Sequence, residues 1–184
     1  MHIRITPLDA PAEEAIAQLE QQPGLVSAYA LRPMDKPQPV LVTVWEAVDD
    51  ADRAPITAGG EDYADCSFEG TGHNDERPAY GQIVYFDGAR TQTESAAIDR
   101  ANRERIAPAV RVIPGNLGAY AGRNPDGSFA VVALTTSLQA VEDAQRAIMS
   151  TELLPGEDPA LLTGPDRIQL AWVLAALPTT PLTV

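Results

Sequence analysis

Pro23–Arg32 reads PGLVSAYALR, and Pro114–Arg123, which begins 91 residues later, reads PGNLGAYAGR. Six of the ten positions are identical, and the two stretches align without a gap. Because the separation is close to half of the 184-residue chain, the repeat predicts a duplicated unit whose two copies pack together.

Apolar periodicity and turn residues around each copy predict the same order of elements, βαββαβ. In the first half we expect strands at 2–6, 25–31, 40–45 and 64–69, and helices capped by Asp9 and Asp49. In the second half we expect strands at 81–86, 117–122, 129–135 and 168–174, a helix at 94–110 and another capped by Ser137. A polar, turn-rich linker at 70–78 predicts units at 1–78 and 79–184.

Each unit alone would leave one apolar face of its sheet uncovered, and two such faces can cover each other. We therefore expect an α+β fold of tandem ferredoxin-like units, whose antiparallel sheets pack as an intrachain pseudo-dimeric barrel. The chain would then be a monomeric pseudo-dimer, and the sequence leaves a further homodimer open.

Composition limits the classes of partner. The formal charge is −13 and Lys36 is the single lysine, so the surface would repel the phosphates of nucleic acid and of anionic membranes. A single cysteine, Cys66, excludes an internal disulfide. The chain carries neither a signal-peptide pattern nor an apolar segment of membrane-spanning length, so we expect a cytoplasmic protein.

One strand and its continuation resemble a known family. Val40–Ala47 reads VLVTVWEA and is similar to the Trp-Glu-Ser signature of the antibiotic biosynthesis monooxygenases, a family of the dimeric α+β barrel superfamily; Val132–Ser137 is a weaker copy. The resemblance implies a cavity between the helices and the sheet of each unit. It also implies cofactor-free oxygenation of polycyclic phenols or, in another branch, haem degradation.

The chain departs from both branches of that family. The oxygenase signature pairs its tryptophan with an asparagine four residues earlier and a tyrosine six later, where this chain has Leu41 and Ala51. In the second unit the tryptophan position falls on Thr135 or Thr136. Haem ligation would need a histidine after the second helix, whereas the histidines are His2 and His73.

Six residues are candidates for a site. We expect catalytic roles for Trp45 and Tyr29, and substrate-binding roles for Arg32, Tyr120, Arg123 and Asn116. The indole would position substrate and oxygen, a phenol would transfer a proton, and an arginine would hold an anionic group. Another interpretation stays open for both groups of residues. The aromatic residues would pack in the core, and the arginines would form ion pairs with nearby carboxylates.

The sequence predicts neither a metal site nor another cofactor, because no histidine joins the acidic run at Asp49, Asp50 and Asp52. The apolar loop at 153–167 would either cover the second cavity as a lid or pack against the sheet edge. Two functions stay open. The protein is either a cofactor-independent monooxygenase that binds an aromatic or polyketide-like small molecule in a barrel cavity, or a non-catalytic ligand-binding or accessory barrel.

Overall fold

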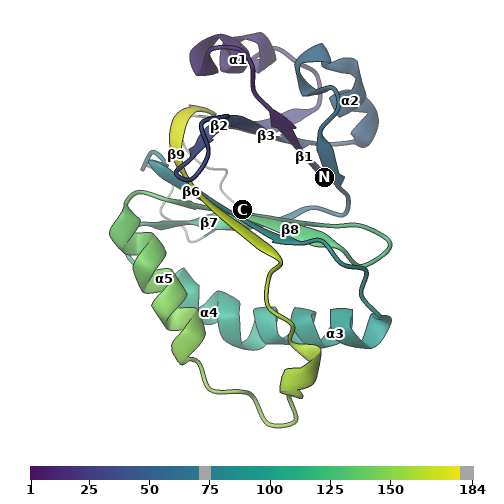
Figure 1. Ribbon diagram of the computed structural model, residues 1–184, viewed down its shortest axis with the longest axis vertical. Coiled ribbons are helices and arrows are strands. Elements are labelled where there is room, and N and C mark those ends of the chain that lie inside the picture. Colours follow the sequence, from purple (N-terminus) through teal and green to yellow (C-terminus); the bar gives the residue numbers. More distant parts are fainter. Residues whose placement is uncertain (71–75, 179–184) are drawn as a thin grey trace.

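A computed structural model describes residues 1–70 and 76–178, and within them nine strands form one antiparallel sheet. The strand order is β4-β1-β3-β2-β9-β6-β8-β7-β5. Figure 1 shows α1 and α2 above the strands of the first half and α3, α4 and α5 below those of the second half. The helices therefore cover the two outer faces, and the strands of both halves lie between them.

The first half follows the expected order closely. Its elements are β1 (His2–Pro7), α1 (Ala12–Leu19), β2 (Leu25–Pro33), β3 (Val40–Trp45), α2 (Val48–Arg53), a 3-10 turn (Pro55–Thr57) and β4 (Glu61–Tyr63). The caps differ from the prediction. Pro11 precedes α1, and the Asp9 carboxylate instead accepts a hydrogen bond from Gln38 Nε2 at 2.9 Å. Asp49 lies in the first turn of α2, which begins after Ala47.

The single strand expected at 64–69 is wrong, because the chain forms two strands there that join different parts of the sheet. β4 pairs with β1, whereas β5 (Ser67–Gly70) pairs with β7 in the second half. Asp65 has a φ of 43°, which interrupts the extended chain between them. Cys66 N–H donates to the Met1 carbonyl oxygen at 2.9 Å, so the connection passes the N-terminal end of β1.

The second half contains β6 (Tyr80–Phe86), α3 (Gln92–Ala101), a π-helical turn (Asn102–Ile106), α4 (Ala107–Arg111), β7 (Asn116–Arg123), β8 (Phe129–Thr135), α5 (Leu138–Ser150), a 3-10 turn (Pro159–Leu161) and β9 (Arg167–Leu177). The helix expected at 94–110 thus begins earlier, at a Thr91–Glu94 capping box, and contains a π-turn. The Ser137 cap is confirmed, because its Oγ accepts from Ala140 N–H at 3.1 Å. Most of the linker expected at 70–78 lies outside the described residues.

The two halves have the same internal strand order and the same register. The first half is ordered β4-β1-β3-β2 and the second β9-β6-β8-β7. A row across the first half pairs Arg4, Thr43 and Ala28, and the corresponding row in the second half pairs Gln82, Ala133 and Ala119. Each position on the first-half sheet therefore has a register counterpart on the second.

The inner faces of the two halves share one hydrophobic core, but the expected barrel of two facing sheets is not what forms. β2 pairs with β9, so the halves belong to one continuous sheet, and that sheet is not closed: β4 and β5 are its edges in the described chain. Leu31 and Tyr29 pack with Ile83 and Tyr120 in the shared core. Where the first copy of the repeat has Leu31, the second has Gly122, and a Cβ there would lie 2.8 Å from Tyr63 Cβ.

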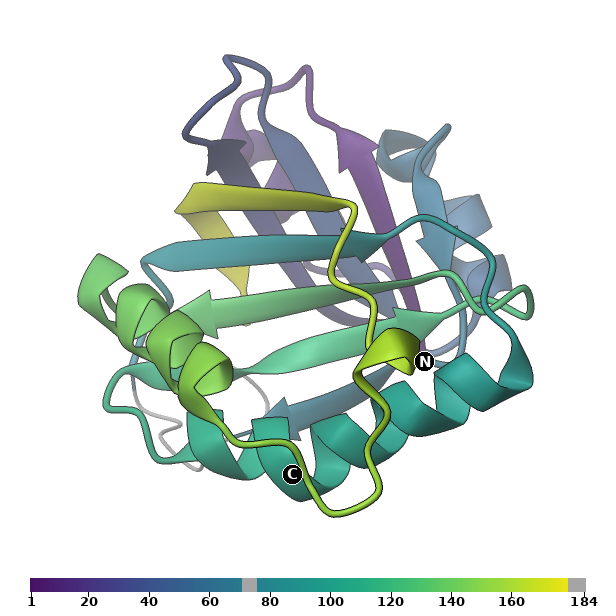
Figure 2. The same ribbon diagram turned by 60° about the horizontal axis from the view of Figure 1, so that its bottom comes forward.

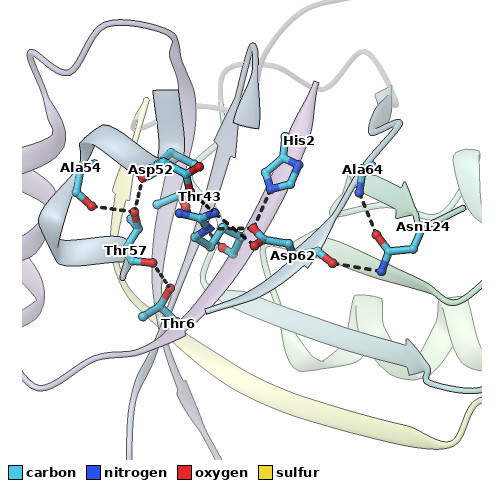
Figure 3. A network of polar contacts seen from close by, with 11 residues as sticks. His2, Thr6, Thr43, Asp52, Ala54, Thr57, Asp62, Ala64 and Asn124 are labelled. Carbon is cyan, nitrogen blue, oxygen red and sulfur yellow. Dashed lines mark hydrogen bonds and ion pairs between the residues drawn. The ribbon is translucent and has the colours of Figure 1, made fainter. Parts of the chain in front are cut away.

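A polar network holds β4 between the halves (Figure 3). Arg4 Nε donates to the Asp62 carboxylate at 2.7 Å, Arg4 Nη2 donates to Asp52 at 2.6 Å, and His2 Nε2 lies 2.6 Å from Asp62 Oδ1. From the second half, Asn124 Nδ2 donates to the Asp62 carbonyl oxygen at 3.0 Å. The network therefore ties the edge strand to β1 and to the β7–β8 connection.

Among the described residues, no helix is long and apolar enough to cross a membrane.

Asp62 should make stability depend on acid pH. Partial burial alone would raise the pKa of its carboxyl, but hydrogen bonds from Arg4 and His2 outweigh that effect and lower it. The lowered folded-state pKa means that the stabilisation is complete above the unfolded pKa of about 4 and is lost as pH falls through the folded pKa. We expect Asp62→Asn to cost about 1 kcal/mol at pH 7, a small value because the carboxylate is 41% exposed. Urea unfolding should show the difference from wild type shrinking below about pH 4, and a difference independent of pH would contradict this assignment.

Candidate functional site

A cavity of about 1200 Å³ lies in the second half, between the outer face of its strands and the helices that cover them. Figure 2 shows α3, α4, α5 and the loop before β9 in front of β6, β7 and β8. Alternation along the strands decides which side chains line it. Gln82, Val84 and Phe86 of β6 line the cavity, whereas Ile83 and Tyr85 are buried in the shared core.

The floor of the cavity consists mainly of small side chains. Ala119 and Ala121 of β7 lie beside Ala133 and Val131 of β8, and all four line the cavity. They are half-buried rather than closely covered. The floor is therefore an apolar surface of small side chains that the helices do not cover completely.

The corresponding face of the first half is filled. Trp45 is the register counterpart of Thr135. Each is the last residue of its strand, and these strands pair with β2 and β7 in the same register. By the same register, Leu41 is the counterpart of Val131. Trp45 and Leu41 are fully buried and pack in one cluster with Leu19 of α1. In the first half, Trp45 and Leu41 under the short helix α1 fill the space that stays open in the second half.

The roof is a helix with an irregular turn. The π-turn between α3 and α4 contributes Asn102, Arg105 and Ile106 to the lining. Such turns place side chains differently from a regular helix and are frequent at functional sites. Val141 and Ile148 of α5, which packs beside α4, also line the cavity.

The apolar loop that precedes β9 covers the cavity rather than packing only against the sheet edge. Leu153, Pro159 and Leu162 line the space. A buried ion pair holds the loop down: Arg105 Nε donates to the Glu157 carboxylate at 3.1 Å, and the two side chains are 11% and 3% exposed. Arg105 Nη1 also donates to Thr151 Oγ1 at 2.7 Å. The loop is thus tied to the π-turn, which is the arrangement of a lid.

The charges that line the cavity differ in balance from those of the whole chain. Four arginines and three acidic residues line it: Arg103, Arg105, Arg111, Arg123, Asp65, Glu69 and Asp99. The chain as a whole has 13 basic and 26 acidic residues. At one end, Arg123 Nη2 donates to Asp99 at 2.6 Å and its guanidinium lies 5.0 Å from the centre of the Phe129 ring. Phe129 in turn stacks on Phe86 at 3.9 Å.

Of the six residues expected at a site, the structure places Arg123 and Asn116 in this cavity. Asn116 Nδ2 donates to the Val110 carbonyl oxygen at 2.8 Å, and its Oδ1 accepts from Gly118 N–H at 3.3 Å. These bonds fix the bulge at the start of β7. Arg32 lies elsewhere: it is exposed, and its guanidinium lies 5.0 Å from the Trp172 ring.

The aromatic candidates lie outside the cavity lining. The Tyr29 and Tyr120 hydroxyls are 3.4 Å apart in the shared core, and burial raises the pKa of both phenols. They therefore stay protonated at neutral pH. Trp45 is buried under α1, and its Nε1 has no hydrogen-bond partner in the part of the chain that the structure describes. These positions favour packing for the three residues.

Sequence reasoning missed Gln82, the π-turn in the helix that roofs the cavity, and the small floor residues. Gln82 is one polar residue in an apolar strand. Alternation along that strand could have assigned its side chain to the face under the helices.

No group of three or more His, Cys, Asp or Glu side chains in residues 1–70 and 76–178 is placed to hold a metal ion. His2 contacts Asp62, and His73 lies outside those residues.

The chain matches known proteins in fold rather than in sequence. No family model matches it, and no curated protein matches its sequence. An anthrone oxidase-like protein has a TM-score of 0.54 at 14% identity, over 95% of this chain and 91% of that one. A ferredoxin-fold protein from Listeria monocytogenes, related to antibiotic biosynthesis monooxygenases, has a TM-score of 0.61 at 10% identity, over 95% and 94%. A major regulator of staphylococcal pathogenesis has a TM-score of 0.62 at 9% identity, over 95% and 100%.

These structures confirm the resemblance that VLVTVWEA implied, at the level of the fold. The chain has a ferredoxin-like α+β fold, which it shares with the Listeria protein related to antibiotic biosynthesis monooxygenases.

Packing and catalysis predict different results at Trp45. If the indole fills the first-half core, Trp45→Phe should cost about 1–2 kcal/mol of unfolding free energy, and Trp45→Thr, which introduces the second-half residue, about 3–5 kcal/mol. If the second-half cavity binds a ligand, the affinity for it should not change in the Phe variant. Urea denaturation and ligand titration measure the two effects. A Phe variant that is as stable as wild type but has lost ligand binding would assign Trp45 to a site.

Proposed function

We propose that this protein binds a large, ring-bearing apolar molecule, aromatic or polyketide-like, in the cavity of its second half. The observation that carries the proposal is the 1200 Å³ space over a floor of Ala119, Ala121, Ala133 and Val131. Ligand pockets usually measure about 300–1000 Å³ and are mainly apolar, with a few placed polar groups. This cavity exceeds that range, so it has room for a ligand larger than a single ring.

The shape of the cavity supports a flat ligand. Small side chains on adjacent antiparallel strands form the floor, and the space between them and the helices could take a ring system. Burying the apolar faces of such a ligand contributes about 25 cal/mol per Å² of surface removed from water. The tied loop would keep water out once the ligand is bound.

We also propose that the chain is a duplicated unit in which the second copy alone keeps the chamber open. The PGLVSAYALR repeat and the common strand order support a duplication. Trp45 and Leu41 fill the first chamber, and their smaller counterparts Thr135 and Val131 leave the second open. Under this proposal the protein is a monomeric pseudo-dimer, in which the two halves of one chain pack as two subunits would.

A second candidate function is oxygenation of the bound ligand without a cofactor. The fold shared with an anthrone oxidase-like protein favours it. In that reaction an ionised phenolic ligand would pass an electron to dioxygen, and nearby donors would stabilise the anion. Here Arg123 would serve, because it lines the cavity and Trp45 and Tyr29 do not.

Anthrone, a three-ring ketone, is a suitable probe. We expect it to raise the melting temperature of the wild-type protein by mass action. Ala133→Phe places a ring on the cavity floor and should weaken binding at least about tenfold, with little loss of stability because it fills open space. Ala96→Phe adds the same ring to an exposed position of α3 and is the matched control.

Thermal shift and calorimetric titration measure binding, and an oxygen electrode measures turnover. Binding that survives in Ala133→Phe, or that Ala96→Phe reduces equally, would contradict the cavity as the site. Oxygen uptake with bound anthrone, lost in Ala133→Phe, would support the oxygenase. Binding without uptake would leave a ligand-binding protein.

A further inference from the structure

Gln82 lies in the middle of β6 and on the cavity side of the sheet. Its strand neighbours are Leu170 of β9 and Ala133 of β8. Val84 follows it on the same face, next to Val131. Gln82 is thus an amide among apolar neighbours, and Asn116, the other amide of the floor strands, is bonded within the β7 bulge.

The Gln82 side chain forms no hydrogen bond with any residue that the structure describes, although it is only half-buried and lines the cavity. Gln169, on the adjacent strand and the opposite face, differs in both respects. It is buried in the shared core and accepts a hydrogen bond from the Tyr85 hydroxyl at 3.3 Å. One glutamine therefore contributes to the core, and the other presents an unused amide to the cavity.

The register counterpart of Gln82 supports this distinction. In the first half the same position is Arg4, since Arg4 pairs with Thr43 as Gln82 pairs with Ala133. The Arg4 guanidinium binds Asp62 and Asp52 and is 7% exposed. At this position the first half uses a polar side chain for structure, whereas the second half leaves one available.

The chemistry of an amide limits what it can recognise. The side chain offers two N–H donors and a carbonyl acceptor, all uncharged, so it suits a carbonyl or hydroxyl group rather than an ion. In an apolar surround, one such bond fixes how a flat ligand lies. A ligand with no oxygen at that point would leave the amide unpaired and desolvated, which is unfavourable.

We propose that Gln82 orients the ligand by hydrogen bonding to a carbonyl or hydroxyl oxygen on its ring system. The ligand class is then an oxygenated polycyclic compound rather than a plain hydrocarbon. This inference rests on the proposed function, because it requires the second-half cavity to bind a ligand. It makes Gln82 a specificity-determining residue.

Phenanthrol and phenanthrene test the proposal, because they have the same three rings with and without a hydroxyl. Wild type should bind phenanthrol about tenfold more tightly than phenanthrene, the discrimination of one well-made hydrogen bond. Gln82→Met keeps the shape of the side chain without the amide. It should lower the affinity for phenanthrol about tenfold, leave that for phenanthrene unchanged, and unfold at the wild-type urea concentration.

Gln169→Met is the matched control. It removes the hydrogen bond to Tyr85 and should reduce stability while leaving the phenanthrol preference intact. If Gln82→Met retains the preference, or wild type has none, the role of Gln82 is wrong although the cavity still binds. If wild type binds neither compound, or Ala133→Phe changes neither affinity, the proposed function fails and this inference with it.

Discussion

The antiparallel pairing of β2 with β9 is the constraint on which the rest of the structure depends. It aligns Ala28–Pro33 with Ala171–Leu177 and makes one sheet from the strands of both halves. The inner faces then share one core, in which Tyr29 and Tyr120 meet. Because the inner face is filled, the outer faces under the helices are where a chamber can form.

Side-chain volume then decides which outer face keeps a chamber. Trp45 and Leu41 close the first, and α1 packs directly on them. Thr135, Ala133 and Val131 leave the second open under a helix interrupted by a π-turn. The Arg105–Glu157 pair holds the covering loop against that turn, so the same irregular helix shapes the roof and fastens the lid. The two halves thus share a strand order and differ in the helices and the loop that cover their outer faces.

Local signals in the sequence predicted the elements well, and non-local pairing limited the rest. The bounds of β3 and β8 are as expected because both strands are rich in β-branched and apolar residues. The split at Asp65 could not be read locally, since β5 is defined by its pairing with β7, far along the chain. VLVTVWEA directed attention to the first half, where Trp45 closes the chamber. Arg123 and Asn116 were found from the repeat, whereas Gln82 lies outside the repeat and was overlooked, although alternation along β6 indicates its face. The unit boundary at residues 78 and 79 stays a prediction.

The central claim is that the second half holds the chamber and the first does not. Amide chemical-shift mapping during titration with anthrone tests it most directly, because the register supplies matched residues in the two halves. The account predicts that Ala119, Ala121 and Ala133 shift strongly while their counterparts Ala28, Ala30 and Thr43 do not. Equal shifts in both sets, or shifts confined to the first half, would contradict it.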